Sequence, residues 1–384
     1  MKKLGFGMMR LPLLTCGKDR DILSADDIDM EQLCEMVDVY LERGFTYFDT
    51  SYVYHNGMSE AAVKKALTDR YPRERYILAD KLPTFQITRK EQVPEIFEEQ
   101  LKNCGVNYFD FYLLHNVWET NYDTNIKECD MFGYAAGMKE AGRVKQLGMS
   151  YHDSPEALDH ILSEHPEIDF VQIALNYYDW NSSFIQAGRC YETIRKYGKK
   201  VIVMQPVKGR SLAVVPDEIK AEMEKQNPEL SPASWAIRFA ASLDGVLTVL
   251  SGMSNMEQIL DNISYMQDFK PLNEAEKKIL ERAVTVMKQE KIIDCNYCGK
   301  CNSVCPQSIH ISDIIENYNH IMFQRERDCN INAELNYYKP LLRRQHGADI
   351  CKQCGRCTEV CPNKLDVIKE LKTASDYELK NSFN

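Results

Sequence analysis

Four side chains in the first third of the chain have types that could act together in acid–base chemistry: Asp49, Tyr54, Lys81 and His115. A phenol such as Tyr54 has an ordinary pKa of about 10, and a neighbouring cation lowers it. Lys81 could supply that charge, and a buried Asp49 could pair with it. The set therefore predicts an active site in which a lysine paired with an aspartate lowers the pKa of a tyrosine.

The same four residues fall at the ends of three successive predicted strands. Asp49 ends the first strand, and Tyr54 follows in its loop before an Asn-Gly turn and a helix that begins at Ser59. Lys81 follows the second strand and His115 the third. Active sites of α/β barrels are built at these carboxyl ends. The three strands are residues 46–49, 76–80 and 108–114.

Apolar, β-branched strands alternate with amphipathic helices, the first of them at residues 27–42. This alternation predicts an α/β fold, a closed (β/α)8 TIM barrel. An open doubly wound sheet is the alternative, but no GxGxxG follows the first strand. The other predicted strands are residues 4–8, 144–150, 170–174, 201–205 and 245–250.

In this order the four residues resemble the catalytic tetrad of the aldo/keto reductases, and the helix start at residues 57–60 also matches that family. The resemblance covers about the first three quarters of the chain. It implies hydride transfer from a nicotinamide to a carbonyl carbon, with Tyr54 as proton donor, Lys81 and Asp49 supporting it, and His115 orienting the carbonyl. Because His115 is not replaced by an acid, carbonyl reduction fits better than reduction of a conjugated double bond.

The resemblance also implies which residues hold NAD(P). Ser150 and Gln172 would hold the carboxamide, but Tyr151 stands where the family usually has an asparagine. Asn176 could replace that asparagine or could cap its loop. Lys208 and Arg210 could pair with phosphates or could be solvated loop cations. The full set is Gly7, Met8, Met9, Ser150, Gln172, Pro206, Lys208, Gly209, Arg210, Gly252, Ser254, Gln258 and Asn262.

Two of these positions bear on the choice of cofactor. Gly252 and Gln258 stand where the family often has a lysine and an arginine that hold a 2′-phosphate. We therefore expect no strong preference for NADPH over NADH.

The expected substrate pocket includes Met9, Tyr54, Trp118 and the loop 177–180, although core packing could equally explain these residues. The substrate itself cannot be read from the sequence.

Eight cysteines form two runs with the spacing C-x2-C-x2-C-x3-C-P, which is typical of bacterial iron–sulfur proteins. Structural zinc would need only four ligands a site and no trailing Cys-Pro. The runs predict two [4Fe–4S] clusters, with the fourth cysteine of each run crossing to the other cluster. One ligand set is then Cys295, Cys298, Cys301 and Cys361, and the other is Cys351, Cys354, Cys357 and Cys305.

The spacer between the runs contains helical patterns and is long for a compact β-rich ferredoxin, so it resembles the α-helical ferredoxin type. We expect three parts: a barrel at 1–270, a helical connector at 271–292 and a ferredoxin-type domain at 293–384. Cys329 lies outside both runs and is expected to be a free thiol. The remaining cysteines are scattered, which favours a reducing, cytoplasmic location over disulfides.

The chain has 384 residues and a net charge of −10, which argues against a general nucleic-acid binder. No run of 18 apolar residues suggests a membrane span. The first residues resemble a signal peptide only faintly, since Arg10 interrupts the apolar run, and we interpret them as the first strand.

Three functions remain open on the sequence. The first is a nicotinamide-dependent carbonyl reductase whose clusters transfer electrons. The second is a flavin- or ferredoxin-linked oxidoreductase on the same barrel, with FMN or another flavin in the barrel or a ferredoxin or flavoprotein as partner. A flavin could couple two-electron hydride chemistry to one-electron clusters. The third is a non-enzymatic redox sensor, against which the complete tetrad argues.

Overall fold

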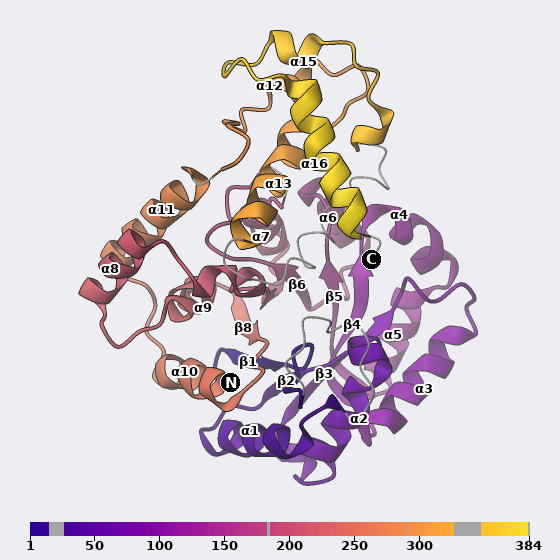
Figure 1. Cartoon of the computed structure of the whole chain (residues 1–384). Coiled ribbons are helices and arrows are strands. Elements are labelled where there is room, and N and C mark those ends of the chain that lie inside the picture. Colours follow the sequence, from indigo (N-terminus) through magenta and orange to yellow (C-terminus); the bar gives the residue numbers. More distant parts are fainter. Residues whose placement is uncertain (15–26, 183–184, 290, 326–346, 383–384) are drawn as a thin grey trace. The chain divides into compact units, whose positions relative to one another are not determined.

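A computed structural model describes residues 1–14, 27–182, 185–289, 291–325 and 347–382. Eight parallel strands pair in chain order and close into a barrel (Figure 1), as predicted. β3 extends beyond the predicted end, so Lys81 lies within the strand. The strands are β1 (Leu4–Gly7), β2 (Tyr47–Asp49), β3 (Ile77–Pro83), β4 (Phe109–Val117), β5 (Val144–Tyr151), β6 (Phe170–Ala174), β7 (Lys200–Met204) and β8 (Val246–Ser251).

Helices follow the strands, and several of them begin at a residue whose side chain caps the first turn. Asp29 accepts a hydrogen bond from the backbone N of Gln32, so the first helix begins three residues later than predicted. Ser154 and Ser231 cap helices that have proline in the first turn. The helices are α1 (Met30–Glu42), α2 (Ser59–Val63), α3 (Gln92–Cys104), α4 (Glu119–Asn121), α5 (Met131–Glu140), α6 (Pro155–Glu164), α7 (Ala187–Lys196), α9 (Pro232–Ser242) and α10 (Met256–Met266).

Apolar side chains fill part of the barrel interior. The Tyr47, Phe111 and Phe170 rings pack edge to face, with centroids 5.1 Å apart in each neighbouring pair. Gly148 makes room for them, since a Cβ there would lie 2.4 Å from Cζ of Phe170. The barrel is therefore a packed core, and polar chemistry is confined to the carboxyl ends of its strands.

The chain divides into two compact units. The barrel unit contains residues 1–181, 185–206 and 229–277 as far as they are described. The second unit contains Ser182, residues 207–228 and the described residues of 278–384. In the second unit, Arg282 pairs with Glu218 and Glu222. The expected boundaries at residues 270 and 292 stay predictions. The remaining helices are α8 (Asp217–Gln226), α11 (Glu274–Gln289), α12 (Lys300–Ser303), α13 (Ile311–Arg325), α15 (Arg356–Glu359) and α16 (Val367–Ser382).

The second unit has its own helical core, as the sequence predicted. α13 packs against α16, and the Tyr318 and Tyr377 rings meet edge to face at 5.6 Å. Ile314, Ile321 and Leu371 are almost fully buried there.

Cys16 and Cys329 lie outside the described residues. Among the described helices, none has the length and apolar character needed to cross a membrane.

Candidate active site and cluster-binding loops

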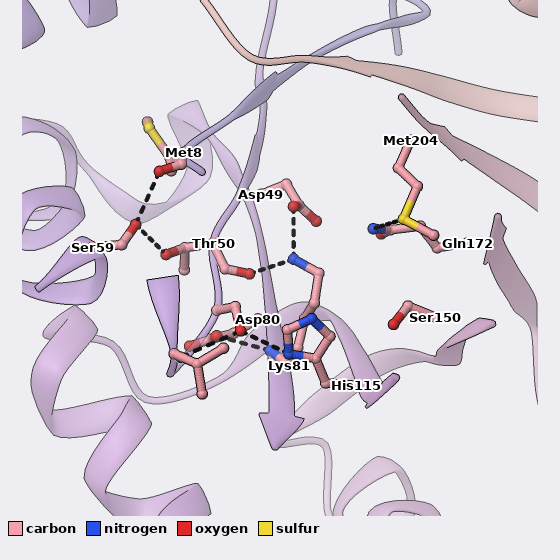
Figure 2. A network of polar contacts seen from close by, with 12 residues as sticks. Met8, Asp49, Thr50, Ser59, Asp80, Lys81, His115, Ser150, Gln172 and Met204 are labelled. Carbon is pink, nitrogen blue, oxygen red and sulfur yellow. Dashed lines mark hydrogen bonds and ion pairs between the residues drawn. The ribbon is translucent and has the colours of Figure 1, made fainter. Parts of the chain in front are cut away.

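Lys81 is fully buried at the carboxyl end of β3 and is held by two acceptors. Its Nζ lies 2.6 Å from Oδ1 of Asp49 and 2.5 Å from the carbonyl oxygen of Thr50 (Figure 2). Burial acts to lower the pKa of Lys81, but the negative charge of Asp49 and the Tyr54 phenol outweigh it, so its pKa is raised. The lysine therefore stays positively charged inside the barrel.

Tyr54 begins a short 3-10 helix, η2 (Tyr54–Gly57), directly after the β2 loop. The Nζ of Lys81 lies 4.7 Å from the centroid of its ring. Burial raises the pKa of Tyr54, whereas the charge of Lys81 acts to lower it. The lowering expected from the sequence is thus present but is outweighed by burial, and the phenol keeps its proton at neutral pH.

His115 lies on β4, with its ring edge to face against Tyr54 at a centroid distance of 5.9 Å. Its Nδ1 lies 3.0 Å from the hydroxyl oxygen of Ser51. Burial, helped by the charge of Lys81, lowers the pKa of His115 well below its usual value. The imidazole is therefore neutral at pH 7 and can donate a hydrogen bond without carrying a charge.

Ser150 and Gln172 face each other in register on β5 and β6 (Figure 2). The backbone N of Asn116 donates to Oγ of Ser150, so the Ser150 hydroxyl can still donate. The Oε1 of Gln172 is buried and has no hydrogen-bond partner among the described residues. Such an unpaired acceptor costs about 1–3 kcal/mol. A carboxamide would satisfy it with its NH2 group while accepting from Ser150, so the pair fits a nicotinamide.

The two residues discussed as replacements for the family asparagine are engaged elsewhere. The hydroxyl of Tyr151 donates to the carbonyl of Ser154 at 2.6 Å. Asn176 donates to Asp179 and to the carbonyl of Gln205, and it accepts from the backbone N of Asp179. Asn176 therefore caps its loop, which was the second of its two alternatives.

Three cofactor candidates lie at the end of β1. Met8 is fully buried and its carbonyl accepts from the Ser59 hydroxyl, while Met9 is 61% exposed. A Cβ on Gly7 would lie 3.3 Å from the carbonyl oxygen of Ser251, so this glycine allows β1 and β8 to approach closely.

The candidates after β8 build the start of α10. The backbone N of Ser254 donates to Oε1 of Gln258, whose own N donates to the cap Asn255. Asn262 donates to Ser251 and accepts from Tyr265. A Cβ on Gly252 would come within 2.8 Å of Cγ of Arg10. Gln258 and Asn262 thus both hold local structure.

The remaining cofactor candidates follow β7. Pro206 belongs to the barrel unit, whereas Lys208, Gly209 and Arg210 belong to the second unit. Lys208 and Arg210 have positive φ angles, and Lys208 is buried while Arg210 is exposed. Their contacts with phosphate stay a prediction.

Two aromatic residues of the expected substrate pocket pack against a barrel helix. Tyr177 and Trp180 both pack edge to face on Phe239 of α9, at centroid distances of 6.2 and 5.7 Å. Trp118 is partly buried, and its backbone N donates to Asn121. Tyr54 lies beside Lys81 in the candidate tetrad.

The two cysteine runs fold alike. In each, the residue two after the first cysteine has a positive φ and donates its backbone N to that sulfur: Tyr297 to Cys295 at 3.3 Å and Gln353 to Cys351 at 3.4 Å. A glycine with positive φ, Gly299 or Gly355, then starts a short helix, α12 or α15. N–H groups aimed at sulfur suit thiolate ligands of a cluster.

The fourth cysteine of each run lies near the other run. One pocket of the second unit is lined by Cys305 together with Cys351, Cys354 and Cys357. On the other side, Cys361 is among the groups that raise the pKa of Cys295, after burial and Cys298. Asn296, which follows Cys295, donates a hydrogen bond of 2.7 Å to Asn363, which comes two residues after Cys361. The residues therefore fit two clusters with crossed ligands.

A buried pair of carboxyl groups, Glu60 and Asp80, lies next to Lys81 and was missed by the sequence analysis. Ligand atoms of Glu60, Asp80 and Cys104 lie within 4.8 Å of one another. Gln100 and Asn103 donate to Glu60, while Asp80 accepts from the backbone N of Lys81. Burial, with repulsion from Glu60, raises the pKa of Asp80 well above its usual value. The strand period could have revealed Asp80, because the residue before the inward-facing Lys81 must face the helices.

Fold and site together define a barrel oxidoreductase with an appended iron–sulfur domain. The aldo/keto reductase family model matches residues 3–284, so the chain belongs to the aldo/keto reductase family. A 4Fe-4S dicluster domain model matches residues 291–365.

Individual relatives agree with this assignment. Probable aldo-keto reductase 1 of Glycine max is 32% identical over 181 residues, which cover 45% of this chain and 47% of the relative, so the chain spans about half of that protein. L-galactose dehydrogenase of Arabidopsis thaliana is 22% identical over 62% of this chain and 79% of the relative. 

Solved structures share the fold. Aldo-keto reductase AKR11C1 from Bacillus halodurans, in its holo form, has a TM-score of 0.55 and 23% identity over 73% of this chain and 91% of its own. The Klebsiella pneumoniae aldo-keto reductase in complex with NADPH has a TM-score of 0.56 and 19% identity over 73% and 90%.

Proposed function

We propose that the barrel reduces aldehydes or ketones with NAD(P)H. The observation that carries this proposal is the buried, charged Lys81 between Asp49 and Tyr54. A buried lysine is costly unless an anion pairs with it, as Asp49 does here, and such groups cluster at functional sites. The charge of Lys81 also faces the phenol that the resemblance assigns as acid. The Klebsiella relative's NADPH supports a nicotinamide as the cofactor.

The chain's own residues would then have distinct roles. Bound NAD(P)H supplies a hydride to the carbonyl carbon. Tyr54 donates its proton to the carbonyl oxygen, and Lys81 stabilises the phenolate that remains. Asp49 holds Lys81 charged, while neutral His115 donates a hydrogen bond to the same oxygen. Gln172 and Ser150 hold the carboxamide so that the ring faces the tetrad.

The test compares two tyrosines of the same loop. Tyr54→Phe should lower kcat for a probe aldehyde such as 4-nitrobenzaldehyde by roughly 10² to 10⁴-fold. Tyr52, whose hydroxyl donates to exposed Glu99, is the matched control, and Tyr52→Phe should keep wild-type activity. Equal activity of Tyr54→Phe and wild type would refute the assignment.

We also propose that the second unit holds two [4Fe–4S] clusters that exchange electrons with a ferredoxin or flavoprotein partner. Two cluster loops with similar backbone conformations support this use, because paired clusters on such cysteine runs are the arrangement of two-cluster ferredoxins. Neither family match supports a flavin. The cluster thiolates favour a reducing, cytoplasmic location.

Anaerobic reduction distinguishes an electron-transfer role from a structural one. A nicotinamide gives two electrons together, whereas each cluster accepts one. Dithionite should therefore reduce the clusters quickly and NADPH alone should not, as followed by EPR. Addition of a reduced ferredoxin should reduce the clusters. Clusters that no one-electron donor reduces would be structural, and rapid reduction by NADPH in flavin-free protein would show that no intermediate carrier is needed.

A further inference from the structure

We propose that Ser51 is a positioning residue that fixes the tautomer of His115. Its hydroxyl donates to Nδ1, so the proton of the imidazole stays on Nε2 and is available to the substrate oxygen. This inference rests on the proposed carbonyl reduction, since it concerns the group that orients the carbonyl.

Ser51 and His115 form a buried pair from two different strand ends. Ser51 is fully buried in the loop after β2, and His115 is 7% exposed on β4. The Oγ–Nδ1 distance of 3.0 Å is that of a good hydrogen bond. The His115 ring is also held edge to face by Tyr54 and by Phe85, each at 5.9 Å. The ring is therefore fixed in orientation, and only its tautomer needs to be set.

The direction of the hydrogen bond follows from the partners of the Ser51 hydroxyl. The backbone N of Val53 approaches its oxygen at 3.5 Å and can only donate. Within the described residues, Nδ1 of His115 is the one hydrogen-bonded atom that could accept the proton of this hydroxyl. A buried hydroxyl proton needs an acceptor, so it points to Nδ1. Nδ1 then carries a lone pair, and in a neutral imidazole Nε2 carries the proton.

The tautomer decides whether His115 helps or opposes the reaction. With the proton on Nε2, the ring presents a donor to the carbonyl oxygen as negative charge develops there. With the proton on Nδ1, the ring would present a lone pair to that oxygen and repel it. Protonation cannot supply the donor instead, because burial and Lys81 keep the imidazole neutral.

The direct test is nitrogen NMR on the full-length protein with ring-¹⁵N-labelled histidine. The His115 signals are assigned by their loss in His115→Asn. We expect wild-type Nδ1 to be unprotonated and Nε2 to be protonated at pH 7. A wild-type His115 with the proton on Nδ1 would overturn the proposal. This measurement needs no substrate, so it stands even where the proposed carbonyl reduction fails.

Variants then separate positioning from packing. In Ser51→Ala, the tautomer with the proton on Nδ1 should become populated, and kcat for 4-nitrobenzaldehyde should fall roughly 3- to 10-fold, the size of one hydrogen bond. NADPH affinity should not change. Ser51→Thr keeps the hydroxyl and should restore both signals and rate, and the exposed Ser163→Ala is the control. A Ser51→Ala protein in which His115 keeps the wild-type tautomer would overturn the proposal.

Discussion

Lys81 Nζ lies 2.6 Å from Asp49 Oδ1, and both side chains are almost completely buried, with exposures of 0% and 3%. The second carboxylate oxygen, Oδ2 of Asp49, has no hydrogen-bond partner among the described residues. The pair therefore depends on one short contact, and either partner left alone would be an uncompensated buried charge.

Removal of Lys81 should cost both stability and activity. Lys81→Met leaves Asp49 buried and unpaired, which costs about 3–5 kcal/mol. The double variant Lys81→Met/Asp49→Asn should recover most of that stability but none of the activity. Thermal unfolding and kcat, measured on both variants, check this. A double variant no more stable than Lys81→Met would show that the ion pair is not the cause.

Asp80→Asn should stabilise the barrel increasingly as pH rises. The pKa of Asp80 is raised in the fold, so the folded state keeps a proton that the unfolded carboxyl has lost. The stability that protonated Asp80 contributes is present at low pH and is lost as pH rises through the folded pKa. The loss is at most about 1.4 kcal/mol per pH unit. An asparagine keeps a donor toward Glu60 without titrating. We expect the gain in unfolding temperature to grow as pH rises above about 4, the ordinary pKa of an aspartate.

Glu60→Gln is the matched control for this pair. Gln100 and Asn103 both donate to Glu60. A glutamine at this position would therefore turn its NH2 group toward one of these two donors. Burial raises the pKa of Glu60 too, so this variant also loses a titrating group, but the clash between donors should make it less stable than Asp80→Asn at every pH. If Glu60→Gln and Asp80→Asn had the same unfolding temperature at every pH, the assignment of the proton of this pair to Asp80 would be wrong.

Cys361→Ala should damage the cluster held by Cys295, Cys298 and Cys301. Wild-type protein purified anaerobically should carry about eight irons and eight acid-labile sulfides. Cys305→Ala should damage the other cluster, and Cys34→Ser, outside both runs, should leave the iron content unchanged. EPR of each variant identifies the surviving cluster. Loss of the cluster of its own run in Cys361→Ala would show that the ligands do not cross.

Binding should show no strong preference for NADPH, with less than a hundredfold difference in Kd from NADH. Neither Gly252 nor Gln258 offers a charge to a 2′-phosphate. Gln258→Arg should tighten NADPH binding and leave NADH unchanged, because only NADPH has that phosphate. A lysine at Gly252 is a poorer test, since its Cβ would collide with Arg10. A wild-type preference above a hundredfold would contradict the expectation.

The sequence predicted the barrel, and it predicted that the four candidate residues meet at one end of it, because both depend on local pattern. Strand periodicity and order brought Asp49, Lys81 and His115 to neighbouring strand ends. Cysteine spacing predicted loops whose conformation repeats at Tyr297 and Gln353. Within those elements, boundaries shifted by a few residues, as at the start of α1, where the cap decides.

Other features could not be predicted because they depend on contacts distant in sequence. Tyr177 and Trp180 pack on Phe239, which no local pattern indicates. Ser51 gains its role only from the position of His115, 64 residues away. Burial at Tyr54 outweighs the charge of Lys81, and burial is a property of the whole fold.

The most direct test of the central claim follows the hydride itself. Wild-type protein is incubated anaerobically with 4-nitrobenzaldehyde and NADPH deuterated at the transferable C4 position, and the alcohol is analysed by mass spectrometry. We expect one deuterium on the carbinol carbon and almost no product from Tyr54→Phe in the same time. Alcohol without deuterium, or equal product from both proteins, would contradict a tetrad-catalysed, nicotinamide-dependent carbonyl reduction.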